Sequence, residues 1–441
     1  MHSTYRADIA VRPRCFTSFF MSRLLSKMEV DRRLVGLAVV LLIIWVGFDI
    51  ASGGRFITPR NIFNLSVQTA SVAVMACGMV LIIVTRHIDL SVGAVLGVLA
   101  MIMGVVQTDV LPQFLDYNHP LTWVLTLLVG IVVGGLIGSI QGVAVGYLGV
   151  PAFIVTLGGL LVWRGSAWWV TQGRTVAPLD QNYILLGGGI EGTIGATWSW
   201  IVALIAILAI IYAAIMERRR RLSFEFPVKP IWAEYTNTII KAGLVLVVVA
   251  TLNAYHLPTR AAERLLENKG IPVTPENLEI SHGIPIPLLI VALVAIILTI
   301  AVKRTRFGRY VFAIGGNPQA AELAGINVKR MTVAVFALMG VLCAISAAIS
   351  SARLQSAGND LGTLDELRVI AAVVIGGTSL AGGLGTIYGA LIGALVMQSL
   401  QSGMALLGVD TSLQSIVIGL VLVVAVFSDK YFHRRYSDPT A

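Results

Sequence analysis

A series of long apolar runs constrains this chain more than any other feature. They recur between residues 34 and 428, and a helix needs about 20 apolar residues to cross a bilayer. Inside lipid only helices and closed barrels satisfy their own backbone hydrogen bonds. The chain is 56% apolar and only 12% charged, against about 25% charged residues in soluble domains. We therefore expect an all-α polytopic membrane protein, and this composition excludes a soluble enzyme.

Twelve such runs can be placed along the sequence. They lie at about 34–48, 66–85, 90–107, 121–147, 151–171, 198–216, 238–254, 284–302, 331–350, 366–381, 386–402 and 411–428. The pair 366–381 and 386–402 is rich in glycine and short on its first arm. It is interpreted either as two full crossings or as a re-entrant hairpin. Between the runs, 253–283 carries several prolines and both charge signs, which indicates an outside loop with one surface helix.

The basic residues are distributed as the positive-inside rule requires. With the N-terminus inside, the segments 1–33, 217–241, 303–330 and 429–441 hold 22 Lys and Arg, whereas the predicted outside connections hold seven. The net charge of +9 therefore reflects topology and does not indicate nucleic-acid binding. We expect a basic cytoplasmic N-terminus at 1–33, a transmembrane domain at 34–428 and a cytoplasmic tail at 429–441. An uncleaved first helix is favoured over a signal peptide, and Met21 is an alternative start to Met1.

Five glycines are spaced four residues apart, from Gly130 through Gly134, Gly138 and Gly142 to Gly146. Residues i and i+4 share one face of a helix, so another backbone can approach this face closely. Static packing is favoured over a sliding contact. The spacing repeats at 385, 389 and 393.

Ionisable residues are nearly absent from the spans. The exception, Arg164, is expected to reach the lipid headgroups, and Asp89 is expected to cap the helix that follows it. No midplane carboxylates suit an ion-coupled carrier, and no phosphate-binding P-loop motif occurs, so any use of ATP must lie in another subunit. No metal-ligand spacing and no structural disulfide are expected from the three cysteines and six histidines.

The loop 303–330 contains a short helix signal. Asn317 is a candidate N-cap, Pro318 suits the first turn and Gly325 suits a helix stop, so Gln319–Ala324 is predicted to be helical. A short helix of small residues suits docking into a partner's groove. The spacing alone leaves docking and a plain surface turn equally open.

In three blocks the sequence resembles the permease subunits of monosaccharide ABC importers, the ribose and xylose family. These blocks are IDLSVG (88–93), AIGGNPQAAELAGINV (313–328) and IAAVVIGGTSLAGG (370–383). The block VPAFIVTL (150–157), followed by Arg164-Gly165, supports the resemblance. The length and an inserted helical pair, with its loops at about 198–283, are more similar to xylose-type permeases. A departure is Arg368, where the family commonly has Asp, and this charge reversal leaves the sugar open.

The resemblance implies about ten core transmembrane helices plus the inserted pair, with a short cytoplasmic coupling helix in loop 303–330. It implies a second copy of the permease, a cytoplasmic sugar-import ATPase, a periplasmic sugar-binding protein and a monosaccharide substrate, in the bacterial inner membrane. ATP and Mg would be bound by the ATPase, with no cofactor in this chain. The residues expected to dock on the ATPase are Asn317, Pro318, Ala320, Ala321, Glu322 and Gly325.

The substrate path cannot be derived from the sequence. Four polar or aromatic residues are candidates for it, Asn64, Gln68, Trp163 and Gln398, although each also suits interhelical contacts or interface anchoring. Permeases for nucleosides or branched-chain amino acids are the alternative within this transport class. An ion-coupled carrier and a membrane enzyme are alternatives from other classes.

Overall fold

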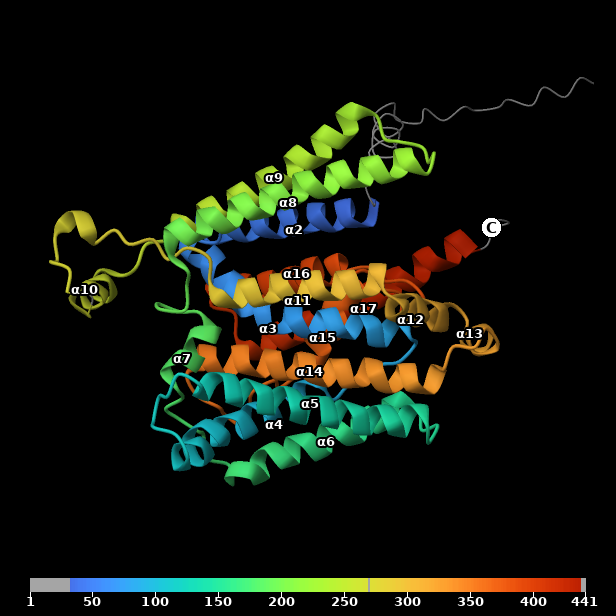
Figure 1. Cartoon of the computed structure of the whole chain (residues 1–441), viewed down its shortest axis with the longest axis horizontal. Helices are drawn as coiled ribbons and strands as arrows, with labels where there is room; N and C mark the ends of the chain where they lie inside the picture. The colour runs from blue at the N-terminus through green and yellow to red at the C-terminus, as the bar shows by residue number, and fades with distance from the viewer. Residues whose placement is uncertain (1–31, 269, 438–441) are drawn as a thin grey trace, which may run out of the picture. The chain divides into compact units, whose positions relative to one another are not determined.

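The computed structural model describes residues 32–268 and 270–437, and the helix labels follow Figure 1. The interpretations of the N-terminal start, of most of the basic segment 1–33 and of Cys15 lie outside these residues. The α-helices are α2 (Arg32–Ala51), α3 (Pro59–Val84), α4 (Val92–Val105), α5 (Thr122–Gly146), α6 (Ala152–Thr171), α7 (Gln181–Ile184), α8 (Gly195–Ser223), α9 (Ile231–Asn253), α10 (Thr259–Asn268), α11 (Ile286–Arg304), α12 (Arg306–Gly316), α13 (Pro318–Leu323), α14 (Val328–Leu354), α15 (Asp365–Ile375), α16 (Ile387–Leu406) and α17 (Thr411–Ser437). α4 continues through a π-helix (Val106–Val110) and a 3-10 turn (Leu111–Gln113).

Ten helices of the described part are long and apolar enough to cross a membrane. They are α2, α3, α4 with its continuation, α5, α6, α8, α9, α11, α14 and α16. Two of the twelve predicted runs fall outside this set. The run 366–381 forms only the 11-residue α15, and the apolar part of α17 spans Thr411–Phe427. The all-α polytopic fold is confirmed.

The chain divides into two units. One combines Val202–Val247 with the described residues up to Gly36, and the other combines 37–201 with 248–437. In the first unit, α8 and α9 form a helical hairpin, and an ion pair joins Arg218 to Glu234 across it. This hairpin lies where the resemblance implies an inserted helical pair, and that it is an insertion stays a prediction.

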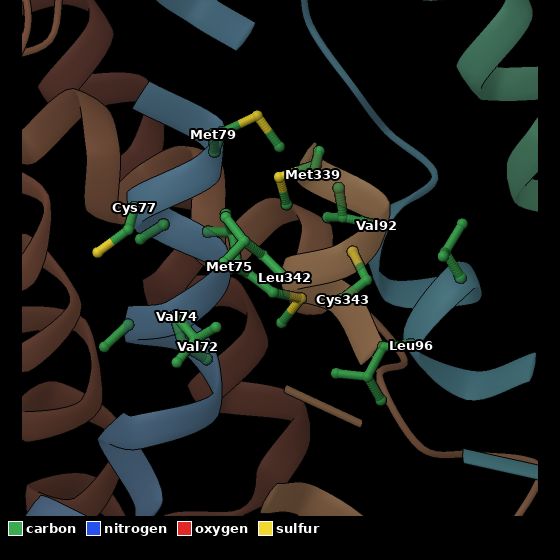
Figure 2. Close-up of a cluster of buried hydrophobic side chains, with 14 of the residues drawn as sticks. Val72, Val74, Met75, Cys77, Met79, Val92, Leu96, Met339, Leu342 and Cys343 are labelled. Carbon is green, nitrogen blue, oxygen red and sulfur yellow. The ribbon is translucent and has the colours of Figure 1, made fainter. Parts of the chain in front are cut away.

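The second unit is organised around α14, which packs against α3, α4 and α5 (Figure 1). Side chains of α3, α4 and α14 meet in one buried cluster (Figure 2). A Cβ atom added at Gly78 of α3 would meet the side chains of Met339 and Leu342. Cys77 and Cys343 are free and buried. A core of small and flexible side chains brings these three helices into close contact.

The glycine stripe of α5 is the seam with α14. A Cβ atom added at Gly138 would lie 2.1 Å from the carbonyl oxygen of Phe336, and one at Gly134 would lie 2.3 Å from that of Gly340. Because these distances are below any normal contact, only glycine permits this separation of the two backbones. The second glycine repeat behaves similarly, since Gly393 of α16 lies against the carbonyl of Ala372 in α15. The predicted close packing is confirmed at both seams.

We call the end of the second unit that carries α12 and α13 the α13 end, and the end that carries α7 and α10 the α10 end (Figure 1). Residues 85–91, after α3, are not helical and extend into the bundle from the α13 end. His87 lies against Phe336, with ring centroids 6.0 Å apart, and Ser91 hydrogen-bonds Gln141. α4 begins at this depth and leads to the α10 end. Residues 85–113 therefore form one broken crossing.

Residues 355–364 extend into the bundle in the same way from the α10 end. Ala357 lies beside Gly104 of α4, and Gly362 lies beside Gly93 of the same helix. Gly93 and Gly104 are eleven residues apart, which places Gly362 about 16 Å deeper in the bundle than Ala357. α15 begins there, and its 11 residues extend about 16 Å, half of a bilayer core of about 30 Å. Gly383 then reaches the α13 end, where its N–H donates to the carbonyl of Val84.

Of the two interpretations of 366–402, the structure favours two crossings over a re-entrant hairpin. The first arm is the second half of a broken crossing that starts near residue 355, and α16 crosses back as a 20-residue helix. The stretch 376–385 ends α15 because it contains Gly376, Gly377, Gly382 and Gly383, three of which have positive φ. The two broken crossings run in opposite directions and meet at Gly93 and Gly362.

Candidate functional site

The segment 317–325 forms the short helix that the sequence predicts. α13 covers Pro318–Leu323, and the Oδ1 of Asn317 accepts a hydrogen bond of 3.1 Å from the N–H of Ala320. The C-terminal end closes as the N–H of Gly325 donates to the carbonyl of Glu322, with φ of +82° at Gly325. Both caps are local, which is why the sequence shows them.

Most of the predicted docking residues lie on the surface of this segment. Asn317, Ala320, Glu322 and Gly325 are exposed and Pro318 is half-buried, whereas Ala321 is only 4% exposed and faces the protein. Ala321 is therefore suited to holding α13 in place rather than to touching a partner. Docking itself stays a prediction.

Sequence reasoning missed Leu323, the last residue of α13, whose side chain is 91% exposed. This leucine, at the end of a capped helix, is accessible for contact with a partner. The signal was present, because Leu323 stands at the helix end between polar and small residues.

α12 connects this segment to both broken crossings. Arg86 donates through Nε to the carbonyl of Gly315, at 2.8 Å, and through Nη2 to that of Gly316, at 2.7 Å. Gly383 packs against the same turn of α12. The end of α12 is thus in direct contact with both 85–91 and 376–386.

The four candidates for the substrate path separate into two groups. Gln68 of α3 and Gln398 of α16 are brought together, with the Nε2 of Gln398 donating to the Oε1 of Gln68 at 3.0 Å. Asn64 is exposed one turn before Gln68. Trp163 lies elsewhere, near Gly159 and Gln141, and its indole N–H is buried without a hydrogen-bond partner among the described residues.

The glutamine pair lines a cavity of about 290 Å³ among α3, α14, α15 and α16. Its amide and charged lining residues are Gln68, Gln398, Gln401, Arg353, Asp365 and Arg368. Ser71 and Ser350 add hydroxyls, which hydrogen-bond each other at 2.8 Å. No aromatic side chain of the described ranges lines this cavity.

The charged groups of the cavity belong to α14 and the start of α15. Arg368 donates to the Oδ1 of Asp365 at 3.0 Å, and Arg353 also interacts electrostatically with that carboxylate. Arg368, where the sequence departs from the family pattern, is thus part of this lining. Sequence reasoning could not find the cavity, because its walls come from distant segments, and Gln68 and Gln398 alone are 330 residues apart.

Arg164 corrects one expectation. Its Nη1 donates to the carbonyls of Asn359 and Leu361, at 3.0 and 2.8 Å, so this guanidinium holds the 355–364 segment and does not reach the headgroups. Asp89 differs in detail, since its Oδ1 accepts from the N–H and hydroxyl of Ser91 one residue before α4 begins at Val92. In both places the polar group satisfies the backbone of a broken crossing.

Within the described ranges, no group of three or more His, Cys, Asp or Glu side chains is placed to hold a metal ion. The polar chemistry of the membrane-spanning part is therefore hydrogen bonding by amides, hydroxyls and guanidiniums. Such groups donate and accept hydrogen bonds, as a polar solute does.

Comparison with known proteins gives one family match. A family model described as the permease component of the branched-chain amino acid transport system matches residues 61–222 and 226–426. No solved structure matches the chain.

Individual relatives match nearly the whole length. The chain is 35% identical over 391 residues to a xylose transport system permease protein of Haemophilus influenzae, covering 89% of this chain and 94% of the relative. The protein of the same name from Escherichia coli is 35% identical over 399 residues, with coverages of 90% and 91%. A ribose import permease protein of Escherichia coli is 30% identical over 393 residues, with coverages of 89% and 92%.

Proposed function

This chain belongs to the family of branched-chain amino acid transport system permease components, and we propose on that premise that it is the permease subunit of an ATP-driven monosaccharide importer. The observation that carries the proposal is the match to xylose transport permeases over about nine-tenths of both chains. Xylose or a similar pentose or hexose is the proposed substrate. The weaker match to a ribose permease supports the same class of substrate.

The proposed partners follow from this role. A second copy of the permease completes the pore, a periplasmic sugar-binding protein delivers the sugar, and a cytoplasmic sugar-import ATPase supplies energy. ATP and Mg are bound by that ATPase, and this chain is non-catalytic. The protein spans the bacterial inner membrane, with both termini cytoplasmic as the basic residues favour.

The α13 segment is the proposed coupling helix. When the ATPase closes on ATP, it displaces α13 and with it α12. Arg86 ties the end of α12 to the 85–91 segment, and Gly383 ties it to the loop before α16. Since α4 and α15, the helices next to these two loops, each begin inside the bundle, this displacement changes which end of the pathway is open.

Uptake of labelled xylose tests the function. Cells lacking this chain, and the same cells with it restored, are compared after ATP depletion and after a protonophore at constant ATP. Restored uptake that requires ATP and survives the protonophore is expected. Uptake that fails with the protonophore at constant ATP would indicate an ion-coupled carrier. Restored uptake of nucleosides or branched-chain amino acids instead of sugars would indicate the other permease class.

Coupling has a separate test in Leu323→Arg. An arginine in place of an exposed apolar anchor is expected to lower uptake and sugar-stimulated ATP hydrolysis at least about tenfold. Leu222→Arg is the control, because Leu222 is also exposed, at the end of α8. Both variants are first checked for equal amounts in the membrane. Unchanged uptake in Leu323→Arg would refute the docking role of α13.

A further inference from the structure

We infer that the cavity among α3, α14, α15 and α16 is a contact site for one neutral monosaccharide within the permease. This inference rests on the proposed function and adds to it the place where the sugar is recognised during passage. The residues that carry it are Gln68, Gln398, Gln401, Arg353, Asp365 and Arg368.

The first argument is the cost of polar groups in this part of the chain. α3, α14 and α16 are membrane-spanning by length and composition, and 94% of the most apolar window of α3 is buried. Ionisable and amide side chains in such surroundings are expensive and mark solute pathways. α3 and α16 nevertheless contribute half-buried amides to the cavity and α15 adds a half-buried ion pair, while the guanidinium of α14, on Arg353, is exposed at the end of that helix.

The second argument is the hydrogen-bonding capacity that the protein leaves unused there. The bond between Gln398 and Gln68 uses one donor and one acceptor, which leaves the Nε2 of Gln68 and the Oε1 of Gln398. Across 32–268 and 270–437, the side chains of Gln401 and Arg353 form no hydrogen bond. A sugar hydroxyl both donates and accepts, so it can bind the free donor and the free acceptor of the glutamine pair.

The third argument concerns charge and size. Asp365 pairs with Arg368 and also interacts with Arg353, which leaves one guanidinium charge in excess, while the remaining polar lining consists of amides and hydroxyls that suit a neutral polyol. The volume of about 290 Å³ stands at the lower end of small-molecule pockets, which suits one sugar ring. Because no aromatic side chain of the described ranges lines the cavity, recognition depends on hydroxyl groups and not on stacking.

A polar route leads to the cavity from the α10 end. Asn61 of α3 accepts a hydrogen bond from Ser402 of α16, two turns before the glutamine pair, and the exposed Asn64 lies between them on α3. Polar contacts between α3 and α16 thus continue from the helix ends down to the cavity. This is the end that the predicted topology places outside, where a binding protein would release the sugar.

The test uses the assembled importer in proteoliposomes with its binding protein at saturation. Uptake rates are measured for xylose and for a monodeoxy analogue, at sugar concentrations that saturate the binding protein with either. Gln401→Leu is the main variant, since Gln401 holds no other part of the described protein in place. Gln181→Leu is the matched control, at an exposed position on α7.

Gln401→Leu is expected to lose one hydrogen bond to the hydroxyl that the deoxy analogue lacks. Its ratio of xylose uptake to analogue uptake should therefore be about 3- to 10-fold lower than in the wild type, and the ratio of Gln181→Leu should not change. A defect of folding or docking would lower both rates equally and leave the ratio unchanged. If the wild type takes up xylose and the ratio in Gln401→Leu is unchanged, the sugar site in this cavity is refuted and the proposed function stands. Wild-type uptake of xylonate in preference to xylose would overturn the neutral ligand, and absence of any sugar uptake by the wild type would overturn the proposed function as well.

Discussion

The seam between α5 and α14 should not tolerate a single added methyl group at Gly138. In Gly138→Ala the new Cβ would stand 2.1 Å from the carbonyl oxygen of Phe336, and ordinary contact begins at 3.4 Å. The two backbones must therefore separate by about 1.3 Å, because a carbonyl cannot rotate away as a side chain can. Overpacking of this kind costs about 1–3 kcal/mol.

Alanine also favours the helix over glycine by about 1 kcal/mol, so a control is needed that shows this effect alone. Gly158→Ala in α6 provides it, since nothing lies within 4 Å of its added Cβ. Since this gain is common to both variants, we expect Gly138→Ala to be about 1–3 kcal/mol less stable than Gly158→Ala. The assay is equilibrium unfolding of the purified protein in mixed micelles with increasing dodecyl sulfate.

Gly134 and Gly340 provide an internal check at the same seam. Each added Cβ meets the carbonyl oxygen of the other glycine, at 2.3 and 1.9 Å. Once one substitution has separated the helices, the second should cost less, so the double variant should be at least about 0.5 kcal/mol more stable than the sum of the single losses. Equal stability of Gly138→Ala and Gly158→Ala, or strict additivity of the pair, would refute this account of the seam.

Two further predictions concern other contacts. Arg164→Met should destabilise the protein by about 2 kcal/mol, since it leaves the partly buried carbonyls of Asn359 and Leu361 without this donor, and it should speed amide exchange in 355–364 while Arg174→Met does not. Equal exchange in the two variants would contradict the role of Arg164 in holding this segment. The pKa of His282, which stacks on Tyr255 in the loop before α11, is lowered by burial and by the nearby His256. The folded state therefore binds fewer protons than the unfolded state, and thermal stability should fall as the pH drops below about 6.5. His282→Phe should keep the stacking and abolish this pH dependence, and a pH dependence that persists in it would exclude His282 as the source.

Local features of the fold were predictable from the sequence. The cap at Asn317, the stop at Gly325 and the glycine stripe of α5 each depend on residues within a few turns of one another. The full-length spans followed from their apolar runs for the same reason.

The features that were not predictable join distant segments. The apolar run 366–381 looks like a span, yet its glycines end α15 half-way, and only packing against α4 and α16 shows how the chain completes the crossing. Arg164 carries no sign of its partners near residue 360. Gln68 and Gln398 were recognised as polar residues in apolar runs, but their pairing depends on the placement of α3 against α16.

The meeting of Gly93 and Gly362 has a consequence for biogenesis. An added Cβ at either glycine would lie 2.2 Å from the carbonyl oxygen of the other, so each broken crossing completes its packing only against the other. The two residues are 269 positions apart, and at 5–20 residues per second the ribosome needs about 13–54 s to make that length. During this interval α5 and α6 already pack against α4, and Ser91 can bond Gln141, but the face at Gly93 still lacks the backbone of Gly362. The α4 end of this first broken crossing is therefore completed only late in synthesis.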